Sequence, residues 1–196
     1  MTACQRTEDP PPATPAPVEI TADAVRSAVL SAGDVGDGWT AEEGATPSTV
    51  QIGGKVGPAN VKESEVSATT AFAQDEGTGY VTNSIFLLST EEVARAYLAE
   101  HREADDKTSW VQERKDGGGA RYERTGQIGN LPSLGDEMYS AKIDAFVTEG
   151  DAEEVERDIE YVAYRIDRVL AFVVAQDVGV GAHVRKQERK LTNLTG

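Results

Sequence analysis

The sequence predicts an α+β fold: a largely antiparallel, twisted sheet with about three helices packed on it. Three observations support this class. Strand-like segments follow one another in pairs joined by turns, as in β-hairpins. Helical segments with an apolar stripe stand before, between and after these pairs. The resulting order, a helix, two strands, a helix, four strands and a last helix, is typical of helices packed on an antiparallel sheet.

The first helix and a long loop occupy the beginning of the domain. Residues 21–30 have Thr21 as a candidate N-cap and place apolar residues on one face. The glycines of segment 33–39 end this helix. Residues 41–62 carry Gly, Pro and Ser without a clear period, which predicts a loop.

A hairpin and a second helix follow. Residues 63–74 and 80–88 are rich in β-branched and large apolar side chains, and segment 75–79 has turn composition. Residues 91–105 form the second predicted helix, with acidic residues in its first turn. His101 falls on the apolar stripe of this helix, so a satisfied, partly buried histidine is favoured over a ligand or a base.

The carboxyl-terminal half predicts four more strands and a helix. Weak strands are expected around 120–128 and 136–147. A hairpin is expected over 157–177, turning at Asp167. Asp followed by Arg is a poorer tight-turn pair than Asn-Gly, so the register stays open. The last helix is expected over 180–194.

Charge excludes one class of partner. The chain has 34 acidic and 19 basic residues and a formal net charge of −15, which would repel nucleic acid. Its one basic cluster lies between residues 185 and 190, on the predicted last helix. There we expect the cations to complement the helix dipole rather than to form an anion site.

The motifs of common enzymes are missing, so we expect no enzyme, no cofactor and no metal. The sequence has no nucleophile elbow, no phosphate-binding loop and no calcium-loop spacing. His183 has no carboxylate at a triad-like spacing. Acidic pairs such as Asp105 and Asp106, or Asp136 and Glu137, could in principle perform acid–base catalysis, although most such runs are solvated surfaces. A carboxylate-based cleft hydrolase therefore stays an alternative.

Three aromatic residues are candidate ligand contacts: Trp39, Trp110 and Tyr139. Both tryptophans lie in loop-like contexts, where large aromatic side chains line ligand clefts or interfaces. The competing interpretation is that they cover the end of the sheet.

The amino-terminal segment points to a location. Cys4 is the single cysteine of the chain, so no intrachain disulfide can form. Five of the eight prolines lie between residues 5 and 17, a composition typical of a stiff, extended spacer. We therefore divide the chain into a tether, 1–18, and a single binding domain, 19–196.

Thr2-Ala3-Cys4 resembles the end of the lipobox of bacterial lipoproteins, with Met1 at the aliphatic position. This resemblance implies that Cys4 is acylated and becomes the mature amino terminus after a signal peptide is removed. No charged or apolar signal segment is visible before Cys4, so we expect that most of the signal lies upstream of the given sequence. The alternative is an accidental cysteine in a disordered cytosolic tail.

The domain is similar to the extracellular sensor-like domains of some bacterial receptor Ser/Thr kinases. The resemblance rests on AVLSAGDVGDGWT, IFLLSTEEVARAYL, LGDEMYSA and YVAYRIDRVLAFVVAQD. It implies a twisted antiparallel sheet with a cleft, usually pinned by disulfides, and binding of a ligand or partner outside the cell.

Together these expectations describe an envelope lipoprotein, held at the cell membrane by its acyl anchor, with a non-catalytic extracytoplasmic domain. The domain would bind an unknown small molecule or an envelope protein. Besides the hydrolase, the second alternative is a structural module that docks another envelope protein.

Overall fold

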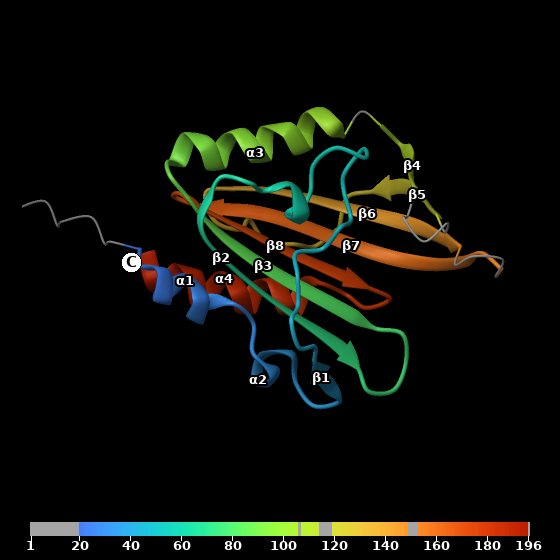
Figure 1. The fold of residues 1–196 in the computed structure, drawn as a ribbon, viewed down its shortest axis with the longest axis horizontal. Helices are drawn as coiled ribbons and strands as arrows, with labels where there is room; N and C mark the ends of the chain where they lie inside the picture. Colours follow the sequence, from blue (N-terminus) through green and yellow to red (C-terminus); the bar gives the residue numbers. More distant parts are fainter. Residues whose placement is uncertain (1–19, 106, 114–118, 149–152, 196) are drawn as a thin grey trace, which may run out of the picture.

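The fold is an eight-stranded antiparallel sheet with helices on both faces (Figure 1), which confirms the predicted α+β class. The computed structural model describes residues 20–105, 107–113, 119–148 and 153–195. In sheet order the strands are β1 (Trp39–Ala41), β2 (Ser64–Gln74), β3 (Tyr80–Leu88), β8 (Val169–Gln176), β7 (Val155–Ile166), β6 (Glu137–Thr148), β5 (Gly119–Gly126) and β4 (Ser109–Glu113).

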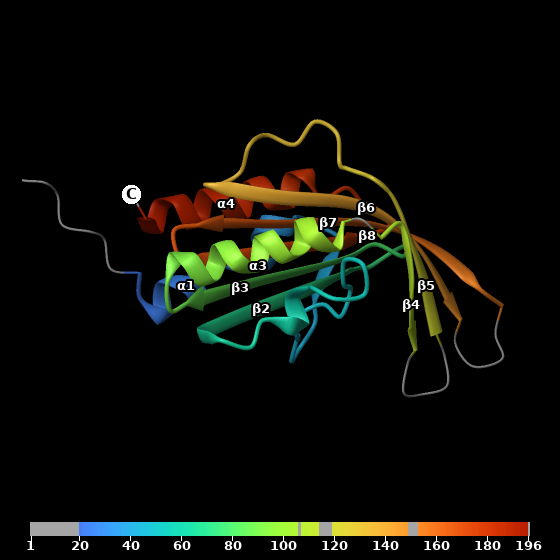
Figure 2. The ribbon, with the colours of Figure 1, turned by 90° about the horizontal axis from the view of Figure 1, so that it is seen from above.

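The helices form a layer on each side of the sheet. They are α1 (Ala22–Ala28), α2 (Ala32–Val35), the 3₁₀ turn η1 (Pro58–Asn60), α3 (Glu91–Ala104) and α4 (Gly181–Thr195). Figures 1 and 2 show α3 over one face, whereas α1 and α4 lie side by side on the other. None of the described helices is both long and apolar enough to cross a membrane.

The central strands β3 and β8 are buried on both faces. Neighbouring residues of one strand point to opposite sides, so Phe86 and Phe172 join the core under α3, whereas Ile85 and Val173 join the core under α1 and α4. β8 is a nearly continuous apolar run in the sequence, a pattern expected of a strand without a solvent-facing side, whereas β3 also buries the polar residues Thr82, Asn83 and Ser84.

The predicted N-cap Thr21 is present, and Thr90 caps α3 in the same way. The Thr21 hydroxyl accepts a hydrogen bond from the Ala24 amide at 3.2 Å, and that of Thr90 accepts one from the Val93 amide at 3.3 Å. Each bond satisfies one of the amides that a helix start leaves without a backbone partner.

The structure fixes the register of the last hairpin. Ile166 pairs with Val169, so the turn consists of two residues, and Asp167 has a φ of 53°. The carboxylate of Asp136 accepts a hydrogen bond from the Asp167 amide at 2.7 Å. A side chain distant in sequence therefore stabilises a turn for which the local residues are a poor choice.

Three short elements differ from the expectation. β1 and α2 lie where the sequence predicted only a helix stop, and β4 lies between the second helix and the next predicted strand. Such elements of three to five residues depend on pairing with distant strands or on tertiary packing, not on a local period.

The expectation that the basic cluster complements the dipole of the last helix was wrong. The last turn of α4 contains no basic residue, so the cluster does not complement the helix dipole there. Lys190 instead lies 2.5 Å from the Asp34 carboxylate and donates to the Val29 carbonyl at 2.8 Å. Lys186 donates to the Asp34 carbonyl. The two lysines thereby stabilise the packing of α4 against the segment that contains α1 and α2.

Candidate functional site

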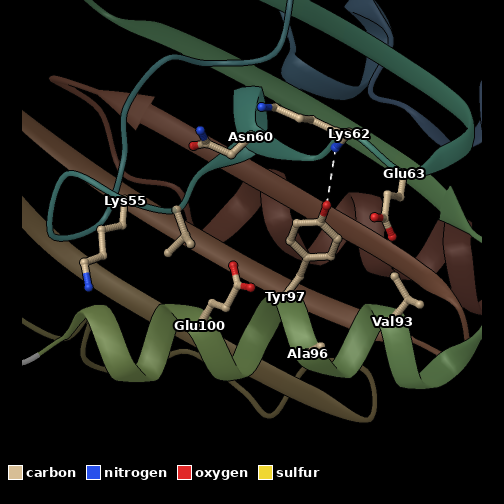
Figure 3. Close-up of a pocket in the computed structure, with 9 residues that line it drawn as sticks. Lys55, Asn60, Lys62, Glu63, Val93, Ala96, Tyr97 and Glu100 are labelled. Carbon is tan, nitrogen blue, oxygen red and sulfur yellow. Dashed lines mark hydrogen bonds between the residues drawn. The ribbon is translucent and has the colours of Figure 1, made fainter.

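A groove of about 390 Å³ lies between α3 and the loop that precedes β2 (Figure 3). We call residues 50–63 of this loop the strap. The strap supplies Lys55, Val56, Asn60, Lys62 and Glu63 to the groove, and α3 supplies Val93, Ala96, Tyr97 and Glu100.

The strap is held down by apolar side chains and a tight turn. Ile52 and Val56 are buried in the core under α3, and their backbones form an antiparallel bridge. Gly53 turns between them with a φ of 58°, and a Cβ at this position would stand 2.5 Å from the Ala104 carbonyl oxygen. Glycine is therefore required both by the left-handed backbone and by the close approach to the end of α3.

Tyr97 joins the two walls of the groove. Its hydroxyl oxygen accepts a hydrogen bond from the Lys62 amide at 3.3 Å, drawn as a dashed line in Figure 3. Within the described part of the chain, the hydroxyl hydrogen has no acceptor. Tyr97 is half-buried and can donate that hydrogen to a molecule in the groove.

Charges of both signs surround this tyrosine. Lys55 and Glu100 lie toward one end of the groove and Glu63 toward the other, with Tyr97 between them (Figure 3). The four charged side chains that line the groove are exposed, and Val56 and Val93 provide apolar surface beneath them. The arrangement suits a small ligand that carries both a cationic and an anionic group.

His101, on the buried side of α3, forms a polar contact with the sheet. Its Nδ1 lies 2.6 Å from the Tyr97 carbonyl oxygen and its Nε2 lies 2.8 Å from the Tyr161 hydroxyl. A carbonyl only accepts, so Nδ1 carries the hydrogen and Nε2 accepts from Tyr161. Burial lowers the pKa of His101 to about 4, which keeps the ring neutral. The predicted satisfied histidine is confirmed, and it is completely buried.

A second polar contact lies at the end of α3, around its C-cap residue Asp105. Tyr139 donates to the Asp105 carboxylate at 2.5 Å, and Arg124 Nε lies 2.7 Å from the same oxygen. Burial and the neighbouring Asp105 carboxylate raise the pKa of Tyr139 well above its usual range. Tyr139 also lies 5.7 Å from the His101 ring, so the two contacts adjoin.

The three predicted ligand contacts do not come together. Trp110 and Tyr139 belong to the core under α3 and are 7% and 5% exposed, respectively. Trp110 stacks on Tyr122 beneath Gly54 of the strap. Trp39 packs against the other core, where its ring meets that of His183 edge-on at 5.8 Å. None of the three lines the groove, so a ligand role for them remains a prediction.

The groove residues carried no motif that sequence analysis could have detected. Tyr97 belongs to the predicted helix 91–105, and most of the strap belongs to the predicted loop 41–62. The hydrogen bond between them joins residues 35 positions apart, and no local period indicates it.

The carboxylates considered for catalysis have structural partners. Asp136 and Glu137 both bind Arg165, at 3.1 Å and 3.0 Å. The hydrogen bond from Arg165 lowers the pKa of Glu137, which therefore stays ionised and is a poor proton donor. Asp105 holds Tyr139 and Arg124, and Asp106 lies outside the described residues, as does Cys4. In the described ranges no group of three or more His, Cys, Asp or Glu side chains could hold a metal ion.

Comparison with known proteins adds one finding at the level of the fold. No family model matches the sequence, and no curated protein matches it. The fold is similar to the extracellular domain of PknH from Mycobacterium tuberculosis. The TM-score is 0.61, and the similarity covers 91% of this chain and 97% of the PknH domain. At 8% sequence identity, the two chains share an arrangement of strands and helices rather than a set of site residues.

Proposed function

We propose that this chain is a cell-envelope lipoprotein whose domain binds a small ligand or a partner outside the cytoplasm without catalysing a reaction. The observation that carries the proposal is the similarity to the extracellular domain of PknH over nearly the whole of both chains. The lipobox-like end at Cys4 and the proline-rich spacer support the anchored location.

We place the binding site in the groove between the strap and α3, and we propose a small zwitterionic ligand. Lys55 and Glu100 would pair with its charges, and the Tyr97 hydroxyl would donate a hydrogen bond to it. A small ligand is favoured over protein docking as the main role. Among the described residues, only Val111 and Val155 are exposed large apolar side chains, and neither lines the groove.

The anchor is tested by metabolic labelling. The full precursor, including its upstream signal, is expressed in a bacterial host with an alkynyl fatty acid. We expect labelling of the wild type and of Gln5→Ala, and none of Cys4→Ala. Equal labelling of Cys4→Ala, or an unlabelled wild type, would exclude the lipoprotein.

The groove is tested separately, by titrating the labelled protein with the zwitterion L-alanyl-L-alanine in heteronuclear NMR. We expect shifts at Tyr97 and its neighbours, with weaker binding in Glu100→Gln and Lys55→Gln. Glu103→Gln is the matched control, because Glu103 is exposed on the same helix but does not line the groove. The acetylated and amidated dipeptide, which lacks both charges, should not bind. Equal binding of the two dipeptides would contradict recognition by charge.

A further inference from the structure

The helices on the two faces of the sheet differ in the sign of their charge. On one side, α4 contacts α1 and α2, and these three helices together carry five basic and three acidic residues, a balance of +2 with histidine neutral. On the other side, α3 carries two basic and four acidic residues, a balance of −2. The layer of α1, α2 and α4 is therefore positive, although the whole chain has a net charge of −15.

The four basic residues of α4 form two pairs with different surroundings. Lys186 and Lys190 are half-buried and bind Asp34, as described above. Arg185 and Arg189 are exposed, and among the described residues neither guanidinium lies within ion-pair distance of a carboxylate. Arg189 Nε donates to the Arg185 backbone carbonyl at 3.3 Å, which leaves the terminal nitrogens of both side chains free to bind an anion.

The two arginines lie on the outermost line of α4. Val184, Gln187 and Leu191 are buried, and they define the side of the helix that packs on the sheet. With about 3.6 residues per turn, Arg185 and Arg189 are one turn apart and point away from that side. Both guanidinium groups can therefore meet a flat surface that approaches α4 from outside.

The acidic residues of this layer already have partners. Asp23 pairs with Arg26 on α1 at 2.9 Å, and Asp34 binds the lysines of α4. Glu188 accepts a hydrogen bond from the Gly135 amide at 3.0 Å. These contacts offset the carboxylates of the three helices, so the two arginines present positive charge that the layer itself does not neutralise.

The amino-terminal segment joins the molecule at the same layer. Ile20 is buried in the core that α1 and α4 cover, and Figure 1 shows α4 beside α1. Cys4 precedes Ile20 by 16 residues, which span at most roughly 55 Å when fully extended. An anchor at Cys4 therefore holds this layer within that distance of a bilayer and raises its local concentration there.

We propose that Arg185 and Arg189 bind anionic lipid headgroups, so that α4 faces the membrane; this inference rests on the anchored location proposed above. A guanidinium group donates paired hydrogen bonds to phosphate oxygens. Each such cation strengthens the contact with an anionic surface about fivefold. The acidic α3 lies beyond the sheet, farther from the surface than the Debye length of about 8 Å, so its repulsion is screened.

A lipid surface is favoured over an acidic protein by the place of attachment. An acidic protein would offer similar charges to the two arginines. The anchor, however, brings the bilayer and not such a protein to this layer, so that even a weak contact is populated.

Arginine footprinting on vesicles tests the orientation. The full unacylated chain is coupled through Cys4, its single cysteine, to a maleimide lipid, so the test does not depend on acylation in a cell. Phenylglyoxal then modifies accessible guanidinium groups, and mass spectrometry gives the rate at each arginine. On vesicles with about 30% phosphatidylglycerol, Arg185 and Arg189 should react at least about threefold more slowly than on phosphatidylcholine vesicles. About 0.5 M NaCl should abolish this protection.

Two variants make the test specific. In Arg185→Gln, Arg189 should lose most of its protection, because one of the two cations is gone and the contact weakens about fivefold. Arg102→Gln is the matched control, because it removes the same charge from a 53% exposed arginine of α3 and should leave both arginines of α4 protected. Both sites are exposed, so the variants should fold, which thermal melting checks.

Equal reactivity of Arg185 and Arg189 on the two kinds of vesicle overturns the proposal. Protection that persists in Arg185→Gln, or that appears to the same extent at Arg95 and Arg102 of α3, overturns it as well. Protection by added polyglutamate but not by phosphatidylglycerol would assign the arginines to an acidic protein instead. Because the tether is chemical, none of these results bears on acylation of Cys4, which the metabolic labelling decides separately.

Discussion

His101 accepts a hydrogen bond from the Tyr161 hydroxyl at 2.8 Å, and both side chains are completely buried between α3 and the sheet. Protonation of the ring would remove the acceptor and leave two donors facing each other. The low pKa of His101, about 4, follows from its burial and makes the folded state sensitive to acid.

Stability should therefore fall between about pH 6.5 and pH 4. The unfolded histidine has a pKa of about 6.5, so on acidification the unfolded chain binds a proton before the folded chain does. The contribution of His101 is complete above pH 6.5 and is lost as the pH falls toward 4, by a total on the order of 3 kcal/mol. Urea unfolding at pH 7 and at pH 4.5 measures this change.

His101→Gln separates this effect from other titrations. The variant should be less stable at pH 7 but should lose less stability between pH 7 and pH 4.5. His183, whose pKa burial also lowers, would leave a residual dependence of the same sign. An unchanged pH dependence in His101→Gln would contradict the assignment.

Gly53→Ala should loosen the strap. The added Cβ meets the Ala104 carbonyl oxygen at 2.5 Å, and the left-handed backbone is strained by any side chain. We expect a loss of roughly 2–3 kcal/mol in the free energy of unfolding. Gly44→Ala is the control, because Gly44 also has a positive φ but has open space around it, and it should lose only about 1 kcal/mol. Equal losses of unfolding free energy in the two variants would mean that backbone strain, and not the contact with Ala104, causes the destabilisation.

Arg165→Gln should destabilise the junction of α3 with β6 and β7. Arg165 is 4% exposed and lies within 3.1 Å of Glu91, Asp136 and Glu137. Its removal leaves three neighbouring carboxylates without their buried cation, at a cost of roughly 2–4 kcal/mol by thermal or urea unfolding. Arg95 contacts two of the same carboxylates but is 53% exposed, so Arg95→Gln should cost less than about 1 kcal/mol. Similar costs for both variants would refute the role of burial.

Asp34→Asn should weaken the attachment of α4. Burial alone would raise the pKa of Asp34, but hydrogen bonds from Lys190 and Ser31 outweigh it and lower the pKa to about 2. The stabilising contribution is therefore present above about pH 4 and is lost as the pH falls through 2. At pH 7 the variant should lose roughly 1–2 kcal/mol in urea unfolding, whereas Asp37→Asn, at an exposed aspartate nearby, should be neutral. A neutral Asp34→Asn would contradict the contact with Lys190.

The sequence was informative where one short segment determines its own structure. Strands β2 and β3 and the helices α1 and α3 were predicted within a few residues, because β-branched composition and an apolar stripe are local properties. The buried state of His101 was also predictable, since its position on the stripe directs it toward the sheet.

The remaining features depend on contacts between distant residues. The turn at Asp167 needs the carboxylate of Asp136, and the strap needs the end of α3 beneath Gly53. Composition also could not place Trp39 and Trp110 on opposite faces of the sheet, because that depends on the pairing of β1 and β4. The groove was missed for the same reason, since its two walls meet only in the folded chain.

The helix layers on the two faces of the sheet place the start of the described chain and the groove on different sides of the molecule. Ile20, where the described chain begins, is buried with α1 in the core that α4 covers, and Figures 1 and 2 place α1 far from β4. The groove opens on the other layer. A molecule tethered through its first residues would thus present the groove away from the point of attachment. Holding the protein in place and binding at the groove would not compete for the same side.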